Sequence, residues 1–308
     1  MTRQSVATPT ASPYVNLRAL DALRRLRFTT RQRIEGAFSG CHRSRQRGGA
    51  GEFVDYREYV EGEDLRRLDW KVLARSGRAY VRLYLDETNL LATLAIDASS
   101  SMLYNAKRGK DRTGSKLEYA QYLAASLPHL ITSQQDQAGL ALLAEDLEVY
   151  LPPASLSAHV AQIQEHIAGI QPQPQTDLAR GLRTLFGQVH RRGVLLLMSD
   201  FLEADLNHVF SSIRLFRHQY WEVVILHLIH PQEERLPAGT AFRFEGLEND
   251  GCIDCSPADV AAEYEKKFAQ HVAAVRMPAL SCGCDYRRVS TATPYLEPLR
   301  TFLIERSA

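Results

Sequence analysis

The sequence lacks any long apolar segment. Its longest apolar runs, such as Val194–Met198 and Val223–Ile229, are far shorter than the roughly 20 residues that a membrane-spanning helix needs. The first thirty residues pass from polar Thr, Ser and Gln directly to an Arg-rich stretch, without the apolar segment of a signal peptide. We therefore expect a cytoplasmic protein.

Cysteine, glycine, proline and net charge are also low. Five cysteines in 308 residues are an odd number in a chain long enough to bury a core, which argues against a disulfide framework. The 18 Gly and 13 Pro are too few for a collagen-like or low-complexity chain. Lys and Arg total 37 against 36 Asp and Glu, and the formal net charge of +1 argues against a histone-like or acidic-tail protein.

The charge is nevertheless unevenly distributed. Residues 1–50 carry ten Arg against Asp21 and Glu35, a net charge of +8, so the rest of the chain carries −7. Leucines recur at helical spacing over 17–26, and we expect residues 1–35 to form a basic N-terminal arm and helix. Arg clusters neutralise phosphates, so nucleic-acid binding is one alternative function, although no recognised nucleic-acid module accompanies the arm.

The next segment, residues 36–88, has a β pattern. Glu52–Tyr59 and Arg78–Leu85 alternate polar and apolar residues, which is typical of half-buried strands. We therefore expect a small β segment before the main domain.

From residue 89 to 308, continuous apolar runs alternate with helical patterns. Such runs suit strands that are covered on both faces of a parallel sheet. The alternation predicts an α/β domain with a doubly wound, mostly parallel sheet, a hairpin insertion near 232–256, and a last strand that could add an edge. The expected strands are Leu90–Ile96, Ala138–Ala144, Val194–Met198 and Val223–Ile229, and the expected helices between them are Lys116–Ser133, Leu156–Ile170, Asp177–Arg191 and Ala204–His218.

Hydroxyl and carboxylate side chains follow these runs, where open α/β sheets bind ligands. Asp97, Ser99 and Ser101 alternate after the first run, Thr176 lies at a predicted helix start, and Asp200 follows the third run. Oxygen ligands of this kind suit Mg²⁺ or Mn²⁺. These residue types are also ordinary turn formers and N-caps, and Thr176 could cap the helix that begins at its neighbour.

The order of these residues resembles the metal-ion-dependent adhesion site of von Willebrand factor A-type domains. The resemblance implies that Ser99, Ser101 and Thr176 touch the metal, while Asp97 and Asp200 hold it largely through water. The metal would keep an open coordination position for the carboxylate of a partner.

An upstream segment makes the resemblance more specific. Its motifs are Gly40-Cys-His42-Arg-Ser44-Arg45, Gly51-Glu52-Phe53, Asp55-Tyr-Arg57-Glu-Tyr59, Gly62-Glu-Asp64, Arg67-Leu-Asp69-Trp70-Lys71 and Ala74-Arg75. With these motifs the chain resembles the domain-of-unknown-function-58 family over roughly residues 36 to 308, most strongly from 40 to 102.

Members of this family are von Willebrand factor A-like proteins that are often encoded beside MoxR-type AAA+ ATPases. The resemblance therefore implies a von Willebrand factor A-like fold and a non-catalytic protein–protein interaction module. It also suggests an adaptor for a MoxR-type AAA+ ATPase or its client.

Catalysis is the other alternative. Asp97 at a strand end is similar to the nucleophile of aspartate-dependent phosphatases, but those enzymes have an acidic residue two positions later, where this chain has Ser99. The chain also lacks a GxSxG elbow, a GxxxxGK[ST] phosphate loop and a GxGxxG turn. We expect no enzyme, and a Mg²⁺-dependent phosphatase-like hydrolase stays the alternative.

Two cysteine pairs raise the question of zinc. Cys252 and Cys255 form a CxxC motif, and Cys282 and Cys284 form a CxC motif, so four thiolates are available. The long separation of the pairs and the CxC spacing fit a zinc ribbon poorly. We therefore favour reduced structural thiols, with Cys41 unpaired.

Overall fold

The computed structural model describes residues 13–16, 20–21, 23, 26, 52–60, 68–85, 90–104, 114–174, 176–237, 239, 241–248 and 251–307. The chain divides into two units: Met1–Arg31 with Leu90–Ala308, and Gln32–Asn89. Most of the predicted arm lies outside the described residues, and so does Cys41. Three leucines of the arm are described: Leu20 and Leu23 are buried in the core of the larger unit, and Leu26 is partly buried against it.

The smaller unit contains the predicted β segment. Strands β1 (Glu52–Glu58) and β2 (Tyr80–Leu85) pair antiparallel, and helix α2 (Trp70–Ser76) lies between them in the chain. Asp69 caps α2, because its Oδ1 accepts hydrogen bonds from the next two backbone N–H groups that follow Trp70. Its Oδ2 accepts a bond from the Tyr56 hydroxyl at 3.0 Å, which ties the helix start to β1.

In the larger unit, six strands of the described chain form one sheet in the order β10-β7-β6-β3-β4-β5. All neighbours are parallel except β4 and β5. The strands are β3 (Leu91–Asp97), β4 (Gln137–Leu143), β5 (Leu147–Ala154), β6 (Val194–Ser199), β7 (Glu222–Ile229) and β10 (Asp285–Ser290). The prediction of an α/β fold with a doubly wound, mostly parallel sheet is thus confirmed.

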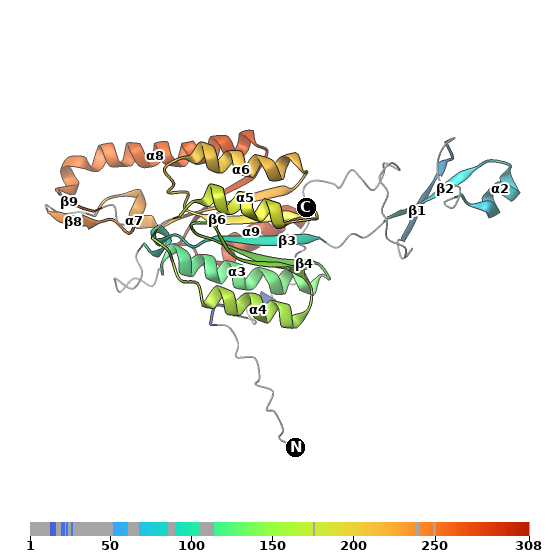
Figure 1. The fold of residues 1–308 in the computed structure, drawn as a ribbon, viewed down its shortest axis with the longest axis horizontal. Coiled ribbons are helices and arrows are strands. Elements are labelled where there is room, and N and C mark those ends of the chain that lie inside the picture. The colour runs from blue at the N-terminus through green and yellow to red at the C-terminus, as the bar shows by residue number, and fades with distance from the viewer. Residues whose placement is uncertain are drawn as a thin grey trace, which may run out of the picture. The chain divides into compact units, whose positions relative to one another are not determined.

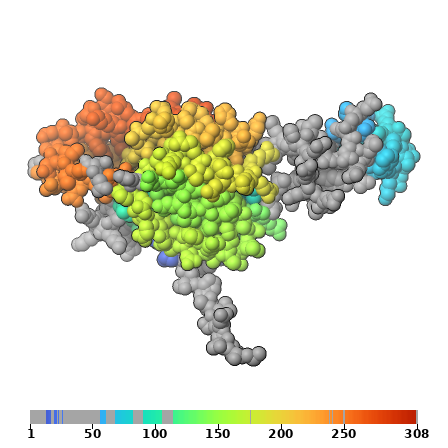
Figure 2. Space-filling model, in the orientation of Figure 1, coloured from blue at the N-terminus to red at the C-terminus, as the bar shows by residue number. Residues whose placement is uncertain are grey.

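Helices cover both faces of this sheet, as Figure 1 shows. One core joins the sheet to α3 (Lys116–Ser133), α4 (Ser157–Ala168) and α9 (Leu296–Ser307). The other joins it to α5 (Leu178–Gln188), α6 (Leu206–His218) and α8 (Pro257–Ser281). Buried apolar side chains fill the space between these layers, and Figure 2 shows the outer surface of the same view. The three central strands β3, β6 and β7 are therefore buried on every residue, as their apolar runs predict.

Two elements differ from the sequence expectation. The antiparallel edge strand β5 is absent from the predicted strands, because Pro152 and Pro153 within it argue against a ladder position; an edge strand tolerates them. For the helix that follows the hairpin insertion, the sequence pattern predicts a span from Pro257 to about Val275, whereas α8 continues to Ser281. The predicted edge strand near the C-terminus is confirmed as β10, which pairs with β7.

The insertion between β7 and α8 consists of α7 (Pro231–Glu234) and a hairpin of β8 (Phe242–Glu245) and β9 (Cys252–Cys255). Figure 1 shows it at the end of the sheet where the parallel strands terminate. Within the described part of the chain, no helix has the length and apolar character to cross a membrane.

Candidate functional site

The site lies at the carboxyl ends of the neighbouring parallel strands β3 and β6. Ile96 and Met198 are register partners, so Asp97 and Asp200 leave the sheet side by side. A third loop is attached to this edge by reciprocal backbone bonds: Ser100 N–H donates to the Gln173 carbonyl, and Gln173 N–H donates to the Ala98 carbonyl, each at 2.9 Å. The sheet thus brings together three loops that are spread over about a hundred residues of the sequence.

Asp97 is fixed by bonds to both of its oxygens. Its Oδ1 accepts from Ser99 N–H at 2.9 Å, and its Oδ2 accepts from the Ser199 hydroxyl. Burial, followed by the negative charge of Asp200, raises the pKa of Asp97 to about 6. The carboxylate is therefore fixed in position, and a positive charge nearby would stabilise its ionised form.

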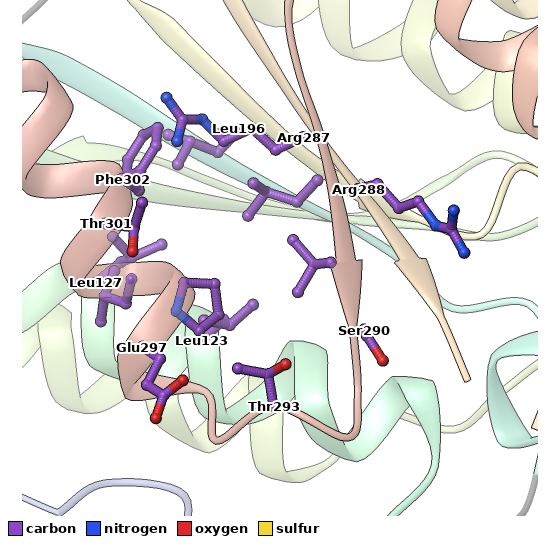
Figure 3. Close-up of a pocket in the computed structure, with 14 residues that line it drawn as sticks. Leu123, Leu127, Leu196, Arg287, Arg288, Ser290, Thr293, Glu297, Thr301 and Phe302 are labelled. Atoms are coloured by element: carbon purple, nitrogen blue, oxygen red, sulfur yellow. The ribbon is translucent and has the colours of Figure 1, made fainter. Parts of the chain in front are cut away.

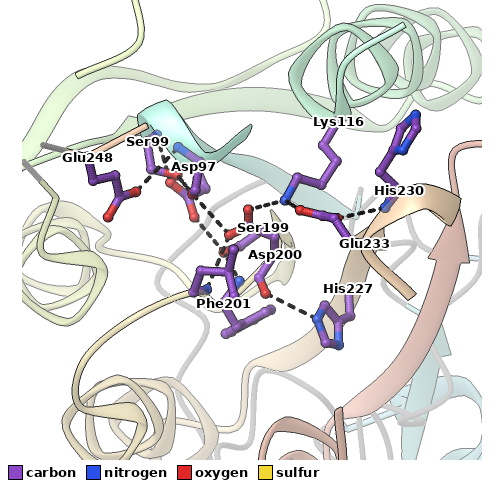
Figure 4. A network of polar contacts seen from close by, with 12 residues as sticks. Asp97, Ser99, Lys116, Ser199, Asp200, Phe201, His227, His230, Glu233 and Glu248 are labelled. Carbon is purple, nitrogen blue, oxygen red and sulfur yellow. Dashed lines mark hydrogen bonds and ion pairs between the residues drawn. The ribbon is translucent and has the colours of Figure 1, made fainter. Parts of the chain in front are cut away.

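The two predicted serine hydroxyls lie together. Ser99 Oγ and Ser101 Oγ are 2.9 Å apart, and the Ser101 hydroxyl donates to Asp200 Oδ1 at 3.3 Å. The structure thus brings four of the five predicted residues, Asp97, Ser99, Ser101 and Asp200, into one hydrogen-bonded group (Figure 4).

Thr176 is half-buried on the loop that follows Gln173. Among the described residues, no hydrogen bond joins its hydroxyl to the other four. The interpretation of Thr176 as an N-cap is wrong, because Asp177 caps α5: its Oδ1 accepts from Arg180 N–H at 2.8 Å. The cap is one residue later because the helix begins at Leu178.

A buried lysine, which the sequence interpretation missed, contacts Asp200. Lys116 Nζ lies 2.6 Å from Asp200 Oδ2 and 2.5 Å from Glu233 Oε1, and the lysine side chain is 0% exposed. Burial opposes the charged forms, but this ion pair outweighs it: the pKa of Lys116 is raised and that of Asp200 is lowered. Lys116 is the first residue of α3, where the helix dipole disfavours a cation. That anomaly is the signal in the sequence that could have found it.

Further carboxylates surround the group. Glu248, at the tip of the β8–β9 hairpin, accepts a bond from Ser101 N–H at 3.3 Å, and Glu203 accepts one from Leu178 N–H at 2.8 Å. Burial, together with the charges of Asp97, Asp177 and Glu248, raises the pKa of Glu203 to about 7. Among the described residues, several carboxylates thus gather at this rim, and Lys116 pairs with Asp200.

The backbone of Asp200 is held from behind. Its carbonyl accepts from His227 Nε2 at 3.1 Å and from His271 Nε2 at 3.3 Å. His227 Nδ1 therefore accepts from the Tyr286 hydroxyl at 2.9 Å, and burial lowers the pKa of His227 to about 3. Phe201 then turns the chain sharply at φ 55, with its N–H on the Ser199 hydroxyl.

Most of the chain matches one protein family. The chain matches the family described as "Protein of unknown function DUF58" over residues 55–274. The chain belongs to this family. The family resemblance predicted from the sequence is thereby confirmed.

Relatives and solved structures are similar to this DUF58 protein over most of its length. Uncharacterized proteins of Mycobacterium tuberculosis and Mycobacterium bovis are each 26% identical over 293 residues, 92% of this chain and 89% of theirs. An aerotolerance-related membrane protein from Bacteroides fragilis is 16% identical with a TM-score of 0.46, covering 70% of this chain and 98% of that one. A von Willebrand factor type A protein from Catenulispora acidiphila is 12% identical with a TM-score of 0.41, covering 74% and 44%. Neither the family's description nor the names of these relatives indicate a catalytic activity.

The two described cysteine pairs of this DUF58 protein lie on different elements. Cys252 and Cys255 are in β9, while Cys282 and Cys284 follow α8. Burial raises the pKa of Cys284 to about 12, so its thiol is protonated. Among the described residues, no group of three or more His, Cys, Asp or Glu side chains could hold a metal ion. A cation at the carboxyl edge would therefore depend on hydroxyl and water oxygens as well as on carboxylates.

A pocket of about 420 Å³ lies elsewhere, between α3, β10 and α9 (Figure 3). Its floor is apolar, with Leu123, Leu127 and Phe302 among the lining residues. The arginines at its rim are already paired, Arg287 with Glu305 and Arg288 with a glutamate of α7. The carboxyl edge, where hydroxyls and carboxylates of separate loops converge, is therefore the better candidate site.

Proposed function

We propose that this DUF58 protein is a non-catalytic protein–protein interaction module. In this proposal Mg²⁺ or Mn²⁺ binds at the carboxyl edge through Ser99, Ser101 and Thr176, with Asp97 and Asp200 acting largely through water. The bound ion would supply an electrophilic coordination position for a carboxylate of the partner.

One observation carries the proposal, the spacing of the two serine hydroxyls. Ligands at adjacent corners of an octahedron with bonds of about 2.0–2.1 Å are about 2.9 Å apart. Ser99 Oγ and Ser101 Oγ are separated by 2.9 Å, beside two buried carboxylates. The donor set consists of hard oxygens, as Mg²⁺ prefers.

Lys116 is compatible with a cation at this position. It contacts Asp200 through Oδ2, whereas Oδ1 faces Ser101. The side of the carboxylate that faces the serines therefore stays available to a cation or to its water ligands. With one lysine among several acids, the charge of the group still favours a divalent cation.

The partner we propose is a MoxR-type AAA+ ATPase or its client, in the cytoplasm. This part of the proposal is supported by the family resemblance, whose members are often encoded beside such ATPases. The acceptor on the partner would be an exposed Asp or Glu, because an open position on Mg²⁺ favours an anionic oxygen.

The test compares capture of the MoxR-type ATPase from the same organism in Mg²⁺ and in EDTA. We expect Mg²⁺ to strengthen capture and Asp97→Asn to abolish that gain. Glu165→Gln, which removes an exposed acid of α4, is the matched control and should behave as wild type. Capture that responds neither to EDTA nor to Asp97→Asn would refute the proposal.

Asp97→Asn should also fold normally. The raised pKa of Asp97 means that burial disfavours its charged form, so a neutral amide at pH 8 costs no more than the carboxylate. Urea unfolding of the metal-free variant, compared with wild type, checks this directly.

Binding of the ion can be measured without a partner. At a metal concentration a hundredfold above Kd, the free energy of unfolding should rise by about 2.7 kcal/mol in wild type and stay unchanged in Asp97→Asn.

A further inference from the structure

The proposed ligands are covered in this structure. Asp97, Ser99, Ser101 and Asp200 are only 4%, 3%, 8% and 3% exposed. A partner's carboxylate needs access to these oxygens. Whatever covers them therefore controls whether a partner can bind.

The chain itself places a carboxylate at this point. Glu248 reaches back from the tip of the β8–β9 hairpin, and its Oε1 accepts a hydrogen bond from Ser101 N–H at 3.3 Å (Figure 4). The two residues are 147 positions apart in the sequence. An acid side chain thus already lies beside a proposed metal ligand.

The hairpin that carries Glu248 is held weakly by its own strands. Each strand has four residues, and most of their side chains are exposed, Ile253 to 67%. A two-stranded hairpin of this kind is marginally stable in water. Its position therefore depends on contacts at its tip and at α7, where Glu233 pairs with Lys116.

We propose that Glu248 is an internal substitute for the partner's carboxylate, and that the hairpin covers the metal site until a partner displaces it. This inference depends on the function proposed above. The partner's acid would compete with Glu248 for one position, so capture would require the hairpin to move.

The carboxylates of Glu248, Glu203 and Asp97 lie close enough to interact with one cation. Glu248 lies within electrostatic range of Glu203, which in turn senses Asp97. Without a cation these carboxylates repel one another, and a divalent ion beside Ser101 would attract all three. We therefore expect cation binding to hold the hairpin tip more firmly on the site.

The test uses the full chain with Mn²⁺ as the probe. Free Mn²⁺ is measured by electron paramagnetic resonance, and the water ligands of the bound ion by proton relaxation. Glu248→Gln should weaken Mn²⁺ binding on the order of tenfold and raise the relaxation per bound ion, because water replaces the carboxylate. Acetate should then lower the relaxation of Glu248→Gln and leave that of wild type unchanged.

The matched control is Glu245→Gln, which removes an exposed acid from the same hairpin. It should bind Mn²⁺ as wild type does. If Glu248→Gln matches wild type in affinity, relaxation and acetate response while Asp97→Asn loses Mn²⁺, the inference is wrong and the proposed function stands. If wild type binds no Mn²⁺, both are wrong.

Discussion

Replacing Lys116 with methionine tests the electrostatic account of the site. Methionine keeps most of the length and apolar volume of the lysine stem but removes the charge. The side chains of Lys116, Asp200 and Glu233 are 0%, 4% and 12% exposed, so two carboxylates would lose their counter-charge in a buried position. Removing one partner of a buried ion pair costs about 3–5 kcal/mol. For a chain of this size, that is a fall in Tm of about 6 to 20 °C.

The assay is urea unfolding in EDTA at pH 8 and pH 5. In Lys116→Met, burial without the ammonium should raise the pKa of Asp200 above its value in the unfolded chain and should raise further the pKa of Glu233, which burial already raises in the wild type. The native state then binds more protons than the unfolded state, so the variant's free energy of unfolding falls as pH rises. The loss relative to wild type should be larger at pH 8. Loss of packing alone would be the same at both pH values.

Two variants complete the experiment. Lys267→Met removes an exposed lysine of α8 and should change stability by less than about 0.5 kcal/mol. Adding Asp200→Asn to Lys116→Met should recover part of the loss, because one of the two stranded charges is then gone. A loss below about 1 kcal/mol that is equal at both pH values would refute the reasoning.

Two further predictions concern the support of the site. His227→Gln should destabilise the protein less at pH 4.5 than at pH 7. The pKa of about 3 keeps His227 neutral in the native state, while the unfolded chain protonates it below about 6.5, and this lowers wild-type stability by up to about 1.4 kcal/mol per pH unit. A difference in unfolding free energy between variant and wild type that stays constant across pH in urea unfolding would contradict this. Gly193→Ala should cost about 1–3 kcal/mol because its Cβ would lie 2.2 Å from the Leu91 carbonyl oxygen, whereas Gly187→Ala, in open space on α5, should stabilise by up to about 1 kcal/mol. Melting curves of the two glycine variants should therefore shift in opposite directions, and a shared direction would contradict the contact argument.

The central sheet could be predicted because its strands are buried on both faces. Continuous apolar runs such as Val194–Met198 are typical of strands that are covered by helices on both faces, and each run ends at a polar residue where the strand ends. The serine and aspartate residues of the site follow from the same rule, since parallel strands bring their carboxyl ends to one edge.

The charged partners of the site could not be predicted in the same way. Lys116 begins an apolar helix, and Glu233 and Glu248 lie in an insertion whose path no periodicity describes. Their approach to Asp200 and Ser101 depends on how β7, the insertion and α3 meet in space. Asp177 was mistaken for a helix residue for a local reason: Thr176 and Asp177 are both good caps, and the hydrogen bond to Arg180 N–H decides between them.

The buried Lys116 contacts both the site and the insertion that carries Glu248. Lys116 divides its charge between Asp200, on the site, and Glu233, at the start of the insertion whose hairpin tip carries Glu248. A cation arriving on the Ser101 side of Asp200 would compete with Lys116 for that carboxylate, and the ammonium would then interact more strongly with Glu233. If the proposed cation binds, charge at the site and the position of the insertion would be coupled through one side chain, without any contact between a ligand and α7.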